Sequence, residues 1–299
     1  MRNPIIIGTR GSDLALWQAV NLQSKLNNNG YHSELKIIKT VGDRVQDLSF
    51  DKIEGKGFFT KEIEDELLNE SVDIAVHSLK DLPTSQPVGL TLGGLSERQD
   101  PSDMLIIRKE SVVMSNDLRL KDNAILGTSS VRRQSIVKDL AQQVNIKELR
   151  GNVPTRVQKL KDGHYDAIIL ASAGLNRLEL DISEFESIRL NPKEFVPAAG
   201  QGVIAYQCRK VDKQMRKVLA TIHTIETSEI TNIERKVLKL MDGGCHIPLG
   251  VYAEKDSNGY FHVWASYAKD KNQKPKRINL SQSTSHKLAE KTVELLLNQ

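Results

Sequence analysis

Alternating runs of apolar and polar residues predict repeated strand–helix units in the first part of the chain. Ile5-Ile6-Ile7 is typical of a short buried strand, and the apolar positions within residues 15–26 then fall on one face of a helix that Ser12 would cap. The elements expected next are a strand at 35–38, a helix that begins after Thr60 and a strand at 72–76. This order is typical of a parallel sheet whose strands are connected by helices.

The same pattern restarts at residue 124, beyond the segment 97–101, whose composition favours a hinge. The elements of this second series are a strand at 124–126, a helix with Ile136, Val137 and Leu140, a strand at 144–149, a helix with Pro154 in its first turn and a strand at 167–170. Two such series imply two parallel-sheet domains. A strand expected at 203–208 fits a return to the first domain, but the pattern leaves its place open.

The character of the chain changes after about residue 220. A helix with apolar positions from Ile230 to Leu240 is followed by the stop signal Gly243-Gly244. Residues 256–259 are a hairpin turn between two expected strands, and a final helix carries Leu288, Val293 and Leu296. This part is interpreted as a small α+β domain.

Composition narrows the class of protein. The 299 residues carry a net charge of +4, which is mild for a protein that coats nucleic acid. The basic run at 269–277 is interpreted as a solvated loop. No apolar run reaches the roughly 20 residues that cross a bilayer, and the N-terminus does not resemble a signal peptide. The expected location is therefore the cytoplasm.

Residues able to bind anions gather where predicted strands end and helices begin. In open parallel sheets this edge binds ligands, because helix N-termini present unpaired N–H groups there. The residues concerned are Arg10, Ser12, Ser78 and Lys80 in the first series and Thr128, Ser129, Ser130, Arg132, Arg133, Arg150 and Arg156 in the second. Alone, the serines also fit plain helix caps, and paired arginines fit surface charge. Their recurrence in both series favours a cleft for a molecule with several negative charges.

The run Gly55-Lys56-Gly57 is not a phosphate-binding P-loop, because its lysine is not followed by Ser or Thr and the glycine spacing differs. Nucleotide binding is therefore rejected there. We expect a loop from which Lys52 and Lys56 reach toward the cleft, with a plain polar loop as the alternative.

Two residues stand out as candidates for chemistry. Asp81 lies among anion donors, where a carboxylate is better suited to a cationic part of the substrate or to proton transfer. Cys245 follows two glycines and precedes His246, which fits a reactive thiol. Cys208, at the end of an expected strand, is interpreted as buried. Two cysteines are too few for a disulfide framework or a zinc site, so no metal is expected.

Read together, several motifs in order resemble the hydroxymethylbilane synthase (porphobilinogen deaminase) family. The matching runs are 9–16 (TRGSDLAL), 55–59 (GKGFF), 73–83 (DIAVHSLKDLP), 127–133 (GTSSVRR), 149–152 (LRGN), 197–202 (PAAGQG) and 243–245 (GGC). The resemblance extends from about residue 5 to 250 and weakens across the C-terminal domain.

The resemblance implies a fold of three domains: two doubly wound α/β domains similar to type II periplasmic binding proteins, and a small α+β C-terminal domain. The expected bounds are 1–98 with 197–218, then 102–193, then 220–299. It also implies a dipyrromethane cofactor held by a covalent thioether to Cys245. The implied reaction deaminates four porphobilinogen molecules and joins them to a linear hydroxymethylbilane, in a cytoplasmic monomer that needs no membrane or nucleic acid.

The resemblance assigns Asp81 to the pyrrole nitrogens and to the positive charge that forms as ammonia leaves. The residues implied to bind cofactor or substrate are Arg10, Ser12, Asp43, Lys52, Lys56, Ser78, Lys80, Thr128, Ser129, Ser130, Arg132, Arg133, Arg150, Arg156, Arg177 and Gln201. Many cations are expected because each porphobilinogen carries an acetate and a propionate.

Two other functions stay open at this point. The same two lobes without catalysis would make a solute sensor or a transcriptional effector domain, which needs neither Asp81 nor Cys245. A Cys–His thiol hydrolase would use Cys245 with His246, and its thiol would react quickly with alkylating agents.

Overall fold

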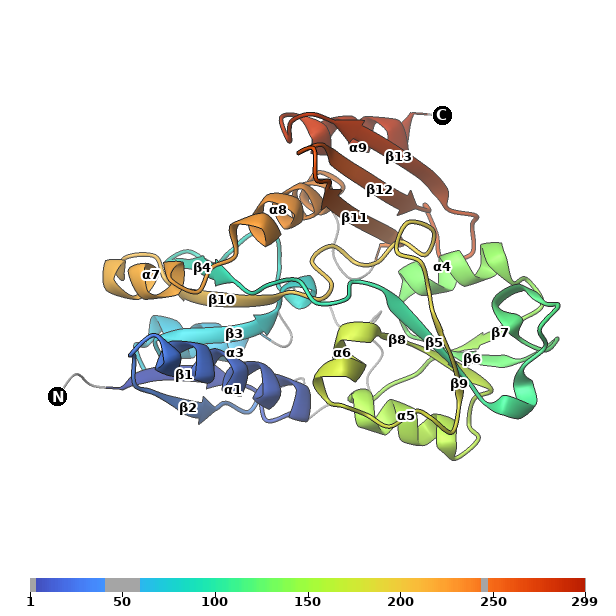
Figure 1. Ribbon diagram of the computed structural model, residues 1–299, viewed down its shortest axis with the longest axis horizontal. Helices are drawn as coiled ribbons and strands as arrows, with labels where there is room; N and C mark the ends of the chain where they lie inside the picture. The colour runs from blue at the N-terminus through green and yellow to red at the C-terminus, as the bar shows by residue number, and fades with distance from the viewer. Residues whose placement is uncertain (1–3, 41–59, 243–246, 299) are drawn as a thin grey trace. The chain divides into compact units, whose positions relative to one another are not determined.

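The computed structural model describes residues 4–40, 60–242 and 247–298 of the chain. It divides into two compact units (Figure 1). Unit 1 comprises residues 1–99 and 202–229, and unit 2 comprises residues 100–201 and 230–299. The first crossing between the units lies within the segment 97–101, where a hinge is expected. The division into three domains with limits near 100, 195 and 220 stays a prediction.

Unit 1 contains a five-stranded mixed sheet in the order β2-β1-β3-β10-β4. Its strands are β1 (Ile5–Thr9), β2 (Ser33–Ile37), β3 (Ile74–Ser78), β4 (Leu90–Leu95) and β10 (Ile204–Arg209). β1 is parallel to β2 and β3, as the alternating pattern predicts, whereas β10 is antiparallel to β3 and β4. The strand near 203–208 therefore belongs to the first sheet.

Helices cover both faces of this sheet. They are α1 (Asp13–Asn28), α3 (Lys61–Leu68) and α7 (Lys213–Ala220). Leu22 of α1 and Leu219 of α7 pack with Ile7 on one face, whereas Ile63 of α3 packs with Ala75 on the other. Because β1 and β3 are apolar on both faces, they are interior strands, and their carboxyl ends lie together at one edge of the sheet.

Unit 2 begins with a second five-stranded mixed sheet, in the order β7-β6-β8-β5-β9. Its strands are β5 (Asp103–Ile107), β6 (Ile125–Gly127), β7 (Asn145–Lys147), β8 (Ala167–Ala171) and β9 (Glu186–Arg189). β6 is parallel to β7 and β8, whereas β5 is antiparallel to β8 and β9. Each lobe is thus a mixed sheet built on the parallel core that the sequence predicts.

The helices of this lobe are α4 (Val131–Leu140), α5 (Val153–Lys161) and α6 (Ser172–Arg177). Ile136 of α4 packs with Leu105 and Ile107 on one face of the sheet, and Leu160 of α5 packs with Ile106 on the other. Asn152 caps α5 by accepting the Thr155 N–H at 2.9 Å, and Pro154 lies in the first turn as expected.

The rest of unit 2 is an antiparallel sheet covered by two helices. Its elements are α8 (Ile225–Leu240, which begins in unit 1), β11 (Leu249–Lys255), β12 (Phe261–Tyr267), β13 (Lys276–Gln282) and α9 (Leu288–Leu297). Val237 of α8 and Leu288 of α9 pack on the same core as Val251. The predicted hairpin turn joins β11 to β12, with Gly259 at a φ of +86°.

The sequence predicts that the basic connection between β12 and β13 is a solvated loop. In the structure this connection also contacts α4. Asp139 of α4 forms ion pairs with Lys274 at 3.2 Å and Arg277 at 2.9 Å. Ser135 of the same helix donates to the carbonyl of Gln273 at 3.2 Å. The small sheet is therefore fastened to the helix that begins beside Arg132.

None of the helices within the described ranges is long and apolar enough to span a membrane.

Candidate active site

In unit 1, two strands deliver polar side chains to the same edge of the sheet. Arg10 directly follows β1, and Ser78 is the last residue of β3, its parallel neighbour. Gln18 of α1 donates from Nε2 to Ser78 Oγ at 2.9 Å, which fixes the serine against the helix. The sequence placed both residues at this edge, and the structure brings them together.

Ser12 is the residue before α1 and has an extended backbone, with φ −74° and ψ 148°. Its side chain makes no capping hydrogen bond to the helix, all of which is described, and it is half-buried. The predicted N-cap position is confirmed, and the hydroxyl remains beside the first N–H groups of α1, a suitable place for an anion.

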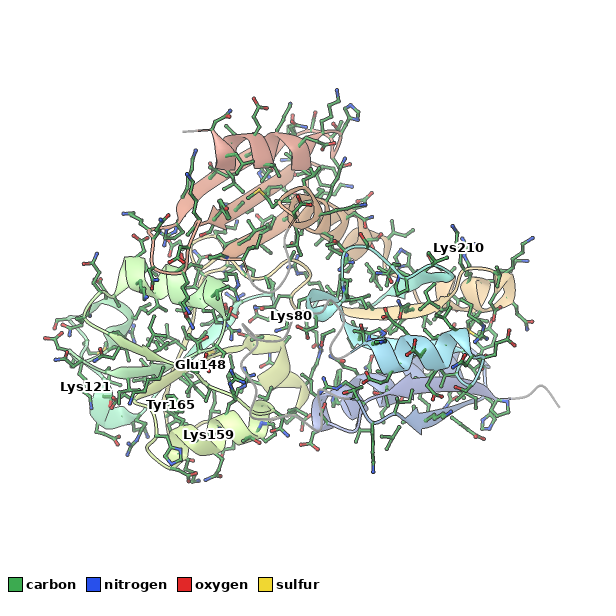
Figure 2. All side chains as sticks on the ribbon, turned by 180° about the vertical axis from the view of Figure 1, so that it is seen from behind. Lys80, Lys121, Glu148, Lys159, Tyr165 and Lys210 are labelled. Carbon is green, nitrogen blue, oxygen red and sulfur yellow. The ribbon has the colours of Figure 1, made fainter. Side chains whose placement is uncertain are left out.

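Lys80 and Asp81 lie on one turn of 3-10 helix, Leu79–Asp81, directly after β3 (Lys80 is labelled in Figure 2). Leu79 is fully buried, and its N–H donates to the Val203 carbonyl at 2.9 Å. The turn is therefore anchored by a buried side chain and by a backbone hydrogen bond. Asp81 is exposed, and its side chain has no hydrogen bond or ion pair with any other described residue. Its carboxylate is thus positioned by the backbone and is available to a ligand.

His77 is buried immediately behind this turn. Its Nε2 lies 3.2 Å from Gln207 Oε1, and Gln207 in turn donates to Glu64 at 2.9 Å. The pKa of His77 is lowered to about 4, mainly by burial and in part by the nearby charge of Arg10, while the hydrogen bond with Gln207 opposes the shift. Because Gln207 presents an oxygen, the neutral imidazole donates from Nε2. His77 is therefore a neutral support for the Ser78–Asp81 turn.

In unit 2, the turn between β6 and α4 is held by its own hydroxyls. Ser129 Oγ donates to the Leu149 carbonyl at 2.9 Å and accepts the Leu149 N–H at 3.1 Å. Thr128 is buried, and its Oγ1 accepts the Ser130 N–H at 3.3 Å. Ser130 caps α4 by position without a capping bond from its side chain. These bonds fix the start of α4, where the two predicted arginines follow.

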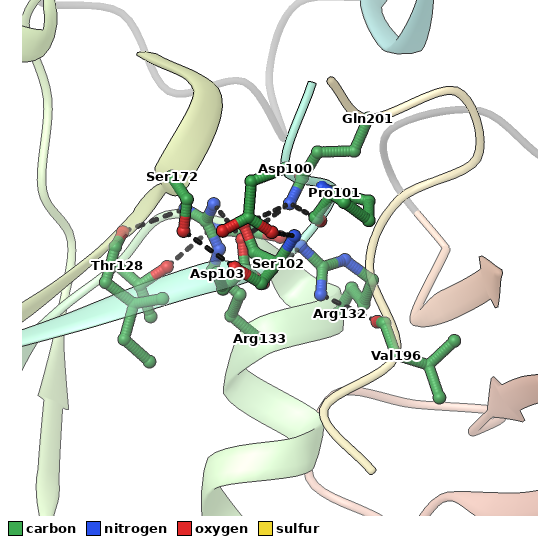
Figure 3. A network of polar contacts seen from close by, with 12 residues as sticks. Asp100, Pro101, Ser102, Asp103, Thr128, Arg132, Arg133, Ser172, Val196 and Gln201 are labelled. Carbon is green, nitrogen blue, oxygen red and sulfur yellow. Dashed lines mark hydrogen bonds and ion pairs between the residues drawn. The ribbon is translucent and has the colours of Figure 1, made fainter. Parts of the chain in front are cut away.

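Arg132 and Arg133 are buried around a carboxylate that the sequence did not reveal as a site residue (Figure 3). Asp103 accepts from Arg132 Nη2 at 2.9 Å and from Arg133 Nη2 at 2.7 Å. The other terminal nitrogens donate to the carbonyls of Val196 at 2.8 Å and Ile169 at 2.9 Å. The interpretation of this pair as surface charge is therefore wrong.

This cluster keeps a positive charge. Burial alone raises the pKa of Asp103, but attraction to Arg132 and Arg133 outweighs it, and the net pKa lies below the usual range. Burial lowers the pKa of Arg132, and Asp103 opposes that shift. Two guanidiniums against one carboxylate leave a net charge of +1. Arg133 Nε is also buried without a hydrogen-bond partner in the described chain. The cluster thus suits one further anion.

Gln201 was predicted to bind a ligand, and its amide nitrogen supports this cluster. Nε2 donates to Asp103 at 2.9 Å and to the carbonyls of Pro101 at 2.8 Å and Ser102 at 3.2 Å. Gln201 is almost fully buried. It therefore fixes the start of β5, and its predicted contact with a ligand stays a prediction.

The remaining arginines of unit 2 occupy the next strand ends. Arg150 pairs with Glu148 at 2.9 Å, and Arg156 Nε donates to the Gly151 carbonyl at 2.7 Å. Figure 2 shows Glu148 near Tyr165, whose hydroxyl donates to the Glu148 carbonyl at 2.5 Å. Arg177 ends α6 and is buried. All three arginines belong to unit 2, the unit that also contains Arg132 and Arg133.

Four predicted site residues, Asp43, Lys52, Lys56 and Cys245, lie outside the described residues, as does His246. Asp103 and His77 were missed as supporting residues. A carboxylate that opens an apolar strand and a histidine inside an apolar run were the only signals available, and neither identifies a partner. In the described part of the chain, no three His, Cys, Asp or Glu side chains are grouped to hold a metal ion.

Comparison with known proteins gives consistent matches over nearly the whole chain. Residues 5–217 match the family model described as porphobilinogen deaminase, dipyromethane cofactor binding domain, and residues 229–292 match that of the C-terminal domain of porphobilinogen deaminase. Porphobilinogen deaminase of Sulfurimonas denitrificans is 41% identical over 263 residues, covering 87% of this chain and 82% of that protein. A probable porphobilinogen deaminase of Methanocaldococcus jannaschii is 43% identical, covering 84% of each.

Among solved structures, a periplasmic substrate-binding protein of an ABC transporter from Coxiella burnetii matches 75% of this chain and 94% of that chain. The two chains are 14% identical, with a TM-score of 0.44. The assignment to mixed α/β lobes with a small sheet domain rests on the elements described above.

Proposed function

The chain belongs to the porphobilinogen deaminase family, and we propose on this basis that it binds and extends a growing pyrrole chain. The protein is a transferase of tetrapyrrole biosynthesis, which deaminates porphobilinogen and joins four molecules stepwise onto a dipyrromethane primer to give linear hydroxymethylbilane. A purely binding role and a thiol hydrolase are thereby set aside.

The side chains of unit 2 fit a primer that carries several carboxylates. The observation that carries the proposal is the buried cluster with a net charge of +1 and an unpartnered donor at Arg133 Nε. We propose that Arg132 and Arg133 bind carboxylates there, together with Arg150, Arg156 and Arg177. When bound, the dipyrromethane supplies the terminal pyrrole carbon to which each new unit is added.

The side chains of unit 1 fit the reacting end of the substrate. Asp81 presents an exposed carboxylate on an anchored turn. We propose that it accepts hydrogen bonds from pyrrole N–H groups and stabilises the positive charge that develops as ammonia leaves porphobilinogen. Arg10, Ser12, Ser78 and Lys80, on the same strand ends, would bind the acetate and propionate groups and so orient the ring.

We propose that the primer is attached to Cys245 through a thioether. The other cysteine is unsuitable, because Cys208 is fully buried in β10 and burial raises the pKa of its thiol to about 11. Cys208 therefore stays protonated at neutral pH. Asp43, Lys52 and Lys56 are proposed to contact the same ligand on the basis of their motifs alone.

Intact-protein mass spectrometry tests this attachment. We expect a mass above the sequence mass by two pyrrole units, and loss of both the added mass and the activity in Cys245→Ser. The matched variant Cys208→Ala should keep both the added mass and the activity, because alanine fits the same buried position and Cys208 is not proposed to carry the primer. An active protein with the unmodified sequence mass would contradict the proposal, and so would rapid alkylation of Cys245 in the active form.

The enzyme is further proposed to work as a monomer in the cytoplasm, with porphobilinogen as its partner and without nucleic acid or membrane. Native mass spectrometry of the same sample checks the first point. A species near the 33.5 kDa chain mass plus the primer is expected, and a stable dimer would contradict it.

A further inference from the structure

We propose that Asp103 is a positioning residue, which sets the direction and the charge of the anion-binding arginines. This inference rests on the proposed function, because it presupposes that Arg132 and Arg133 bind carboxylates. Asp103 is the first residue of β5, and its side chain is fully buried. A buried carboxylate is unfavourable unless charged donors surround it. The role of Asp103 is therefore inferred from the side chains that donate to it.

The geometry fixes each guanidinium at two points. Arg132 gives one terminal nitrogen to Asp103 and the other to the Val196 carbonyl, and Arg133 divides its nitrogens in the same way between Asp103 and Ile169 (Figure 3). Two hydrogen bonds in different directions set the plane of a guanidinium, which a single bond does not. The remaining N–H groups of both arginines are thereby aimed by protein contacts before any ligand binds.

Asp103 is itself held in place. Gln201 Nε2 donates to one of its oxygens at 2.9 Å and also bonds to the carbonyls of Pro101 and Ser102. The Val196 carbonyl that receives Arg132 is equally constrained, because a Cβ on Gly250 would lie only 2.4 Å from that oxygen. The start of β11, which follows Cys245 in sequence, therefore packs on the carbonyl that orients Arg132.

The charge balance explains why a carboxylate is needed. Without Asp103 the cluster would contain two neighbouring guanidiniums and no anion, and their repulsion would turn them away from each other. With Asp103 the net charge is +1, enough to attract one carboxylate of the ligand. The positioning role and a simple charge role therefore predict opposite effects when Asp103 is neutralised.

Asp103→Asn, prepared as holoenzyme, separates the two roles. If the arginines kept their places, the added positive charge would tighten anion binding and lower the KM for porphobilinogen. If Asp103 positions them, KM should rise about tenfold or more, and intact mass should show a smaller fraction loaded with primer. The kcat of the loaded fraction should change less than KM. An unchanged or lowered KM in folded enzyme would overturn the proposal.

Asp166→Asn is the matched control. Asp166 lies in the same lobe, where it accepts the Ile125 N–H at 2.8 Å and pairs with Lys121 at 2.7 Å, and neither partner belongs to the arginine cluster. It should leave KM and primer loading unchanged. Asp103→Glu keeps the charge and should give a KM between those of the wild type and Asp103→Asn. Should the Asn variant not fold, folded Asp103→Glu decides: a raised KM supports the proposal and an unchanged KM contradicts it.

Arg132→Lys and Arg133→Lys distinguish failure of this inference from failure of the proposed function. If both lysine variants keep the wild-type KM and primer loading, the arginines do not bind the ligand and the proposed function fails at this site. If they lose both while Asp103→Asn does not raise KM, only the positioning role fails.

Discussion

At the scale of single residues, the described site depends on buried polar groups that touch no proposed ligand. His77 and Asp103 lie behind the residues that the motifs point to, and both have strongly shifted pKa values. Burial favours the neutral form of His77, whereas two arginines keep Asp103 ionised despite its burial. Because their environments differ, the two groups affect the stability of the fold in different pH ranges.

The shift of His77 predicts a loss of stability in mild acid. Its pKa falls from 6.5 to about 4 on folding, so the unfolded chain takes up a proton at a higher pH than the folded chain does. The stability that neutral His77 provides is therefore complete above about pH 6.5 and is lost as the pH falls toward 4. When the pH falls from 7 to 5, the free energy of unfolding should therefore decrease by about 2 kcal/mol because of His77.

Urea unfolding of wild type and His77→Gln at pH 7 and pH 5 checks this value. Glutamine keeps an amide donor toward Gln207 but does not titrate, so the variant should lose less stability between the two pH values. His164→Gln, at an exposed position, is the control and should follow the wild type. Equal pH dependence in wild type and His77→Gln would show that His77 does not titrate in this range. Asp103 affects a separate window, below about pH 4.

At the scale of elements, the interior strands could be predicted from sequence, and the antiparallel additions could not. β1, β3, β6 and β8 are short apolar runs followed by turn residues, which a parallel sheet requires. β4 contains Gly93 and Gly94, which resemble a turn in sequence. A Cβ on Gly93 would lie 2.4 Å from Leu219 of α7, so close packing of that helix accounts for the first of these glycines.

The candidate site, like the sheets, could be predicted only where it depends on local sequence pattern. The strand-end positions of Arg10, Ser78 and Arg132 follow from local pattern, because parallel strands bring their carboxyl ends to one edge. The burial of Arg132 and its pairing with Asp103, 29 residues earlier, depend on the antiparallel place of β5 beside β8. No local pattern encodes that pairing, so the supporting carboxylate could not be predicted.

The contact between α4 and the β12–β13 connection gives a prediction about an element. Asp139→Asn removes the charge that holds Lys274 and Arg277, and its side chain is largely buried, so we expect a loss of about 1 to 2 kcal/mol in the free energy of unfolding. Hydrogen exchange in residues 270–275 should also accelerate. Glu184→Gln, which breaks an exposed pair with Lys161, should change little. Unaltered exchange in the connection would contradict this account.

At the scale of the whole molecule, the proposed chemistry is divided between two compact units. Asp81 and the strand ends beside it belong to unit 1, whereas the buried cations belong to unit 2. A substitution in the first unit should therefore impair the chemical step without disturbing the cluster that is proposed to retain the primer. Primer content and turnover are separate quantities: primer content reports on the proposed binding cluster in unit 2, and turnover reports on the strand ends in unit 1.

Asp81→Asn tests this division. Asp81 is exposed and has no partner among the described residues, so its replacement should change the free energy of unfolding by no more than about 0.5 kcal/mol. The primer should remain, as judged by intact mass. Loss of the carboxylate that stabilises the developing cation should lower kcat about 100-fold or more. Asp65→Asn, an equally exposed change on α3 of the same unit, should leave kcat unaltered. Near-normal turnover in Asp81→Asn would remove its catalytic role, and loss of the primer would mean that the two units do not act separately.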